Sequence, residues 1–75
     1  MKPYRDVDHD SGVAAYDDGA GSMLVQFKDG AVYEYTDASA GAANIAEMKR
    51  RAAAGDGLNA FITKHVRKRY SRRVR

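Results

Sequence analysis

The stretch FKDGAVYEY, from Phe27 to Tyr35, constrains the fold more than any other part of the chain. Its Asp29-Gly30 pair stands between segments rich in strand-forming residues, which is typical of a β-hairpin. Side chains alternate between the two faces of a strand, so Tyr33 and Tyr35 share one face. The direction of that face decides whether the tyrosines fill the core or form an exposed platform for stacking.

The length of the hairpin loop fixes this direction. A two-residue loop would set Val25 opposite Glu34 and so place a carboxylate among apolar side chains. A three-residue loop, with Gly30 in a left-handed bulge, instead sets Val25 opposite Tyr33. We expect this second register, because it turns Glu34 to water and makes Tyr33 and Tyr35 core residues with their hydroxyls at the rim. An exposed pair of tyrosines that stacks on bases is the alternative.

The remaining segments predict an α+β fold, in which a three-stranded antiparallel meander is packed on one face by two C-terminal helices. An alanine-rich helix follows the meander and ends at Gly55-Asp56-Gly57, where Asp56 is a candidate cap for the last helix. Thr36, Asp37 and Ser39 are all candidate caps for the first. The expected organisation is one domain with a flexible lead-in at 1–10, the β-meander at 11–36, helices at 38–54 and 58–70, and a basic tail at 71–75.

Composition limits the function. The chain has 75 residues and thirteen of them are alanines, so few bulky side chains remain to enclose a deep pocket. An enzyme is therefore not expected, and the sequence contains no Ser/His/Asp set, HExxH motif or phosphate-binding glycine loop. No cofactor is expected. The lack of cysteine and of a long apolar run predicts a cytoplasmic protein that does not enter a membrane.

Charge is distributed unevenly along the chain. Residues 1–37 carry three basic and eight acidic side chains, whereas residues 38–75 carry ten basic and two acidic ones. This asymmetry is expected of a protein that meets a polyanion at one end. The alternative is a solvated, solubilising surface. The candidate phosphate contacts are Lys64, Arg67, Lys68, Arg72, Arg73 and Arg75, joined by Lys49, Arg50 and Arg51, and the candidate stacking residues are Tyr33, Tyr35 and Tyr70.

Several short motifs occur in an order that is found in a known family. They are Tyr16-Asp17, the spaced series from Met23 to Tyr35 with its central Tyr33-Glu34-Tyr35, Gly57-Leu58-Asn59, and Val66-Arg67 followed by Tyr70. In these residues the chain resembles the KTSC domain, named for the C-terminus of certain lysyl-tRNA synthetases and also found as a stand-alone protein in bacteria and phages. The resemblance covers residues 7–71 and departs from the family pattern before the first strand and after Tyr35. It implies no enzymatic role and suggests RNA binding.

Two classes of function follow. The leading hypothesis is a small nucleic-acid-binding module, with RNA as the expected partner, that uses the basic C-terminal helix. The alternative is a protein-interaction or phage-type accessory module that docks on an acidic protein or self-associates through the sheet. Leu24 and Val32, which the expected register leaves on the outer face, favour this alternative, because apolar residues there need a cover.

Three other features favour structural roles. Asp6, Asp8 and Asp10 have the spacing of a calcium loop, but the loop glycine is late and no helix flanks them, so an acidic lead-in is expected instead of a metal site. His65 is expected to be a half-buried packing residue. Arg67 has a structural alternative to phosphate binding, because it is a candidate ion-pair partner for Glu34.

Overall fold

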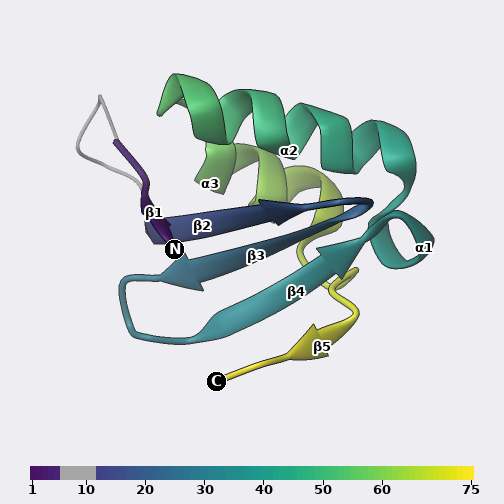
Figure 1. Ribbon diagram of the computed structural model, residues 1–75, viewed down its shortest axis with the longest axis horizontal. Helices are drawn as coiled ribbons and strands as arrows, with labels where there is room; N and C mark the ends of the chain where they lie inside the picture. Colours follow the sequence, from purple (N-terminus) through teal and green to yellow (C-terminus); the bar gives the residue numbers. More distant parts are fainter. Residues whose placement is uncertain (6–11) are drawn as a thin grey trace.

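The structure, a computed structural model that describes residues 1–5 and 12–75, contains a five-stranded antiparallel sheet in the order β1-β2-β3-β4-β5 with helices against one face (Figure 1). The strands are β1 Lys2–Pro3, β2 Val13–Gly19, β3 Ser22–Phe27, β4 Val32–Thr36 and β5 Arg72–Arg73. The helices are α1 Asp37–Ala40, α2 Ala42–Ala54, α3 Leu58–Phe61 and the π-helix η1 Ile62–Val66. The predicted α+β class is correct, but the sheet has a further short strand at each edge of the predicted meander.

The central hairpin has the register that the sequence predicts. Val25 lies opposite Tyr33 and Met23 opposite Tyr35. The Phe27 amide donates to the Ala31 carbonyl at 2.9 Å, which closes the three-residue loop. Gly30 within this loop has a φ of 94°, a value that glycine adopts without the steric cost of a side chain.

The predicted helix at 38–54 is divided into α1 and α2. The Thr36 hydroxyl accepts a hydrogen bond from the Ser39 amide at 3.0 Å, so Thr36 is the cap among the three candidates. The chain then leaves helical geometry at Gly41, where φ is 95° and ψ is 138°. Ala40 on one side of this break and Ile45 on the other are both buried, so the break lets two helical segments of different direction pack on one sheet.

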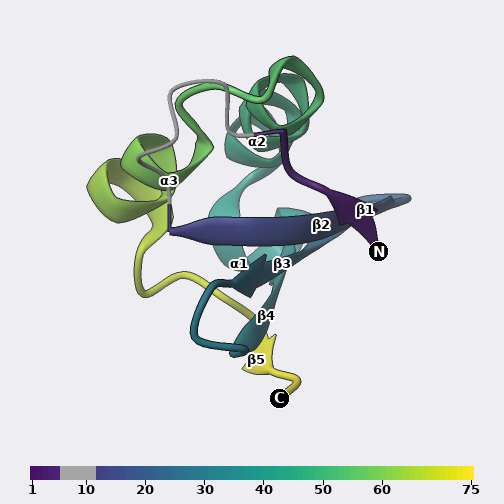
Figure 2. The same ribbon diagram turned by 90° about the vertical axis from the view of Figure 1, so that its left-hand side faces the viewer.

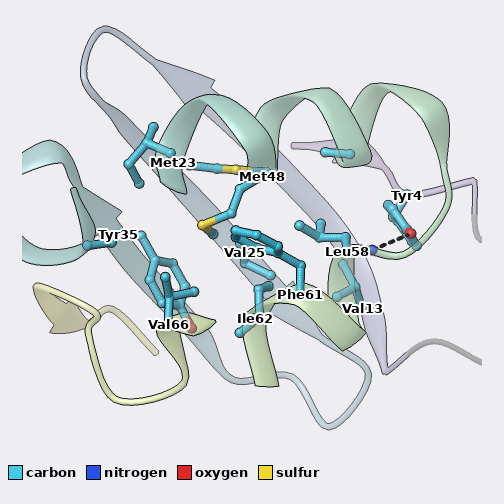
Figure 3. Packing of buried hydrophobic residues seen from close by; sticks show 13 residues of the cluster. Tyr4, Val13, Met23, Val25, Tyr35, Met48, Leu58, Phe61, Ile62 and Val66 are labelled. Atoms are coloured by element: carbon cyan, nitrogen blue, oxygen red, sulfur yellow. Dashed lines mark hydrogen bonds between the residues drawn. The ribbon is translucent and has the colours of Figure 1, made fainter. Parts of the chain in front are cut away.

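The last helix is shorter than predicted and lacks the predicted cap. Helical structure ends at Val66, so Tyr70 lies in the connection to β5 and not on the helix. No side-chain cap is made by Asp56, because Gly57 takes the N-cap position. Instead the Leu58 amide donates to the Tyr4 hydroxyl at 3.2 Å (Figure 3).

The chain segments at both edges differ from the predicted flexible lead-in and basic tail. Tyr4 is buried, with 6% of its surface exposed, and the β1 residues next to it pair with β2. At the other edge, the Val74 amide donates to the Val32 carbonyl at 2.7 Å, and the Val32 amide donates to the Arg75 carbonyl at 3.1 Å. Residues 6–11, which include the calcium-like aspartates, lie outside the described part of the chain.

The core lies between the sheet and the helices, and α2 and α3 cover the same face of the sheet (Figure 2). It combines apolar side chains from β2 to β4 with the inward side of the helices. The largest side chains with almost no exposed surface include Tyr35, Met23, Met48, Leu58, Val13, Val25 and Val66 (Figure 3). The expectation that the tyrosine pair points inward is confirmed fully for Tyr35, whereas Tyr33 is half-buried at the edge of the core.

Candidate nucleic-acid interface

A pocket of about 570 Å³ lies where the β3–β4 turn meets the end of η1. Its aromatic lining consists of Phe27, Tyr33, Tyr35 and Tyr70. The other lining residues are Gly12, Lys28, Asp29, Ile62, Thr63 and Arg67. The volume lies within the range of about 300–1,000 Å³ that is typical of small-molecule sites. The pocket is an open hollow beside the core and not an enclosed cavity, so the few bulky side chains of the short chain suffice to form it.

The aromatic rings of the pocket contact one another. The Tyr33 and Tyr70 ring centres are 4.7 Å apart with an angle of 49° between the planes, and Phe27 meets Tyr33 edge-on at 5.8 Å. Tyr70 also meets Tyr35 edge-on at 6.4 Å. Such tilted and edge-on contacts are the favoured geometries for aromatic pairs. Tyr70 nevertheless keeps 41% of its surface exposed, so one ring of the cluster is open to a ligand.

The pairing of β5 with β4 separates two neighbouring arginines. Arg73 lies opposite Tyr33 and Arg72 opposite Glu34, and adjacent residues of a strand point to opposite faces. The Arg73 guanidinium carbon lies 5.7 Å from the centre of the Tyr33 ring, on the pocket side of the sheet. Arg72 donates from Nε to Glu34 Oε1 at 3.0 Å on the other side. The candidate phosphate contacts in β5 therefore do not share one surface.

Glu34 pairs with Arg72 and not with Arg67, so the alternative expected for Arg67 is wrong. The pairing follows from the strand register, which brings Arg72 directly across from Glu34. Arg67 instead lines the pocket, one helical turn after Thr63, which lines it too. Within the described part of the chain, no ion pair involves the Arg67 guanidinium.

The three basic residues of α2 all have hydrogen-bond partners within the protein. Arg50 and Arg51 both donate to the Glu47 carboxylate, at distances of 2.5–2.9 Å. These hydrogen bonds lower the pKa of Glu47 to about 2, and the bond from Arg50 has the larger effect. Lys49 donates to the Gly19 carbonyl at 2.5 Å. Arg51 is held further by the Phe61 ring, whose centre is 5.1 Å from its guanidinium carbon.

The other predicted phosphate contacts are exposed and lie outside α2. Lys64 is on η1, Lys68 lies just after its end, and Arg75 follows β5. Among the described residues, none of these three side chains forms an ion pair. Lys64, Arg67 and Lys68 therefore form an exposed cationic group at the helix end, which we call the η1 cluster.

Two expectations about burial are wrong, one for His65 and one for the pair Leu24 and Val32. His65 is exposed and not half-buried, because η1 turns it outward, where it lies against the Phe61 ring at a centroid distance of 4.7 Å. Val32 is only 1% exposed and Leu24 is half-buried. The outer face of the sheet consequently lacks the exposed apolar pair that favoured docking or self-association there.

Tyr35 contributes a neutral phenol to the pocket wall. Burial raises the pKa of Tyr35 to about 12, and the nearby phenols of Tyr33 and Tyr70 add to this effect. Only 2% of its surface is exposed, yet it lines the pocket, so its small accessible part lies at the pocket wall. Its hydroxyl is therefore a neutral hydrogen-bonding group at any physiological pH.

The sequence patterns alone did not reveal the pocket residues Phe27, Ile62 and Thr63. The signal that could have found Thr63 is its i, i+4 relation to Arg67, because residues at this spacing lie on one side of a helix. No group of three or more His, Asp or Glu side chains suited to a metal ion occurs within residues 1–5 and 12–75. No helix in this described part has the length and apolarity needed to cross a bilayer.

Comparison of the chain with models of known protein families, with curated proteins and with solved structures gives no match.

Proposed function

We propose that this protein is a small nucleic-acid-binding module, not an enzyme, and that RNA is its partner. The observation that carries the proposal is the position of Arg67, which is exposed, lines an aromatic pocket and lacks an ion-pair partner in the described chain. Lys64 and Lys68 extend the positive charge beside it. An arginine that is not neutralised within the protein remains available for bidentate contacts to phosphate oxygens.

The proposed surface is narrower than the set of basic residues in the sequence. It comprises the η1 cluster with Arg73 and Arg75, because the Lys49 ammonium and the guanidinium groups of Arg50, Arg51 and Arg72 have partners within the protein. Arg73 donates from Nε to the Arg75 carbonyl at 2.9 Å, but among the described residues its guanidinium forms no ion pair. Binding through phosphates is mostly independent of sequence and depends strongly on salt, because each contact releases counterions. The proposal therefore predicts weak, salt-sensitive binding unless the aromatic residues contribute as well.

The resemblance to the KTSC family supports the same proposal. Several of its motif residues, Tyr33, Tyr35, Arg67 and Tyr70, line one pocket although they are far apart in the sequence. Residues that form a shared surface are reasonable candidates for a shared function. We propose membership of this family on the same footing as RNA binding, which is the role that the resemblance suggests.

A pair of charge-matched double variants tests the proposed surface. Arg67→Gln with Lys68→Gln removes two charges from the η1 cluster, whereas Arg50→Gln with Arg72→Gln removes two charges that are already paired. Binding of a fluorescent RNA is measured at about 50 and 200 mM salt. The first variant is expected to bind more weakly and to reduce the logarithmic salt slope by about 1–2, because each lost phosphate contact lowers that slope by about 0.7–0.9.

The control variant is expected to bind nearly as the wild type does. Equal losses in the two variants would mean that only net charge matters and would contradict a localised surface. Wild-type binding that does not change with salt would contradict phosphate contacts altogether. Circular dichroism of both variants checks that they are folded, which is expected because Arg50, Arg67, Lys68 and Arg72 are exposed.

A further inference from the structure

Phosphate contacts alone give no role to the aromatic side of the pocket. Tyr70 lies against Tyr33 and Tyr35, at ring-centre distances of 4.7 and 6.4 Å, but remains 41% exposed. Tyr33 is in turn contacted by Phe27 at 5.8 Å. The exposed ring is thus held by neighbours before any ligand arrives. A planar ligand that stacks on it would lose little additional side-chain freedom, which favours affinity.

The polar groups around these rings indicate the chemistry of the ligand. Arg67 supplies a cation at the pocket wall. Arg73, next to the lining residue Tyr33, supplies a second one 5.7 Å from the centre of that ring, and its Nε donates to the Arg75 carbonyl at 2.9 Å. The wall also contains Asp29, whose carboxylate accepts a hydrogen bond from the Ala31 amide at 2.9 Å. A ligand that is only an anion would gain nothing from the rings and would be repelled by the Asp29 carboxylate. A ligand that is only apolar would desolvate Arg67 without replacing its hydrogen bonds.

A planar heteroaromatic ring that carries an anion matches both halves of the pocket. Nucleotides have this chemistry, and bases stack on tyrosine or on an arginine plane in many single-strand binding sites. In a duplex the bases are stacked on one another, so the faces that Tyr70 could contact are covered. The pocket volume of about 570 Å³ is in the range that accommodates a small ligand unit.

We propose that this pocket binds one unstacked base of a single-stranded nucleic acid, with the base against Tyr70 and the flanking phosphates on Arg67 and Arg73. This inference rests on the proposed nucleic-acid function and deepens it, because it assigns preference for single strands to a defined set of side chains. The phosphates give the salt dependence, and the base pocket gives discrimination between single and double strands.

The test compares three ligands and four proteins. The ligands are a fluorescent single-stranded RNA of about 10 nucleotides, the same strand in an RNA duplex, and a free ribonucleoside monophosphate. The proteins are the wild type, Tyr70→Ala, Tyr70→Phe and Arg67→Gln. Tyr70→Phe keeps the stacking ring and loses only the hydroxyl. Circular dichroism and thermal melting establish that each variant is folded, and Arg67→Gln keeps the test valid if Tyr70→Ala does not fold.

We expect the wild type to bind the single strand more tightly than the duplex. Tyr70→Ala is expected to weaken single-strand binding about tenfold and to leave duplex binding unchanged, since stacking of a base on an aromatic side chain contributes on this scale. Tyr70→Phe is expected to bind almost as the wild type does. Arg67→Gln is expected to weaken single-strand binding and to reduce its dependence on salt.

Other results would overturn the inference in distinguishable ways. Equal binding of single strand and duplex, with normal salt dependence, would refute the base pocket and leave the phosphate surface intact. Unchanged single-strand affinity in folded Tyr70→Ala would do the same. A mononucleotide that binds as tightly as the strand would show a site for free nucleotides instead. Absence of binding to every nucleic acid would refute both proposals.

Discussion

Arg73 lies directly across the β4–β5 ladder from Tyr33, and its guanidinium carbon is 5.7 Å from the centre of the tyrosine ring. This pairing brings a cation from the end of the chain onto an aromatic residue of the central hairpin. It exists only because β5 joins the sheet in a particular register. Shifting that register by one residue would place either Arg72 or Val74 opposite Tyr33 and would turn Arg73 to the other face of the sheet.

The first prediction concerns the edge strand. The replacement Val74→Pro removes the backbone N–H that donates to the Val32 carbonyl at 2.7 Å. The strand β5 should therefore detach from β4 or pair with it less well. We expect a loss of about 1–2 kcal/mol in the free energy of unfolding, from one ladder hydrogen bond and greater exposure of Val32. Urea denaturation measures the change. Val74→Ala is the control, because it keeps the amide, and a similar loss in this variant would argue against the ladder as the cause.

The second prediction concerns the N-terminal segment. In Tyr4→Phe the ring stays in place, but the Leu58 amide loses the hydroxyl that accepts its hydrogen bond at 3.2 Å. A buried amide without a partner costs about 1–3 kcal/mol, which should appear as a lower free energy of unfolding. Tyr16→Phe provides the matched control, because Tyr16 is half-buried and no hydrogen bond is formed by its hydroxyl within the described residues. Equal stabilities of the two variants would contradict this role for Tyr4.

The third prediction concerns alkaline pH. Burial raises the pKa of Tyr35 from 10.0 to about 12 in the folded protein. The neutral phenol therefore stabilises the fold fully below pH 10, and this contribution disappears as the pH rises through 12. The difference corresponds to roughly 2–3 kcal/mol. The test is an alkaline titration of the wild type and of Tyr35→Phe, in which the absorbance of ionised tyrosine and the loss of folded structure are both followed. A folded protein in which all tyrosines ionise together near pH 10 would disprove it.

The fourth prediction concerns acid pH. Hydrogen bonds from Arg50 and Arg51 lower the pKa of Glu47 from 4.5 to about 2. The ionised carboxylate should therefore stabilise α2 at pH above 4.5, and the contribution should fade as the pH falls toward 2. Helix content measured by circular dichroism should decrease less over this interval in Glu47→Gln, which has no carboxylate to titrate there. Identical acid profiles of the two proteins would show that the pair is broken in solution.

Local sequence signals were sufficient for several parts of the fold. The Asp29-Gly30 pair and the alternation around it determined the hairpin register, because a slip of one residue would bury Glu34. The helix stop at Gly55 likewise follows from short-range chemistry, whereas the sequence limited the first cap only to Thr36, Asp37 or Ser39. The inward position of Tyr35 follows from the same register, since only one face of the hairpin carries large apolar side chains.

Long-range pairing accounts for what the sequence did not predict. The strands β1 and β5 are too short to show a periodic pattern, and they form because the edges of β2 and β4 offer unpaired backbone groups. The end of the last helix at Val66 could not be inferred from its apolar spacing, which continues to Tyr70. The errors at the helix end and at β5 both concern residues 66–75, the segment that carries Tyr70, so the sequence placed this ring on a helix instead of in the connection to β5.

The amino-acid sequence by itself determined the fold class, the register of the central hairpin and the excess of positive charge near the end of the chain. Only the tertiary structure decided which of those charges are free. Glu47 and Glu34 engage Arg50, Arg51 and Arg72, whereas Arg67 lines the pocket beside Tyr70. The physical reason is that propensity and alternation act over a few neighbouring residues, while ion pairs and pockets depend on which distant segments the backbone brings together.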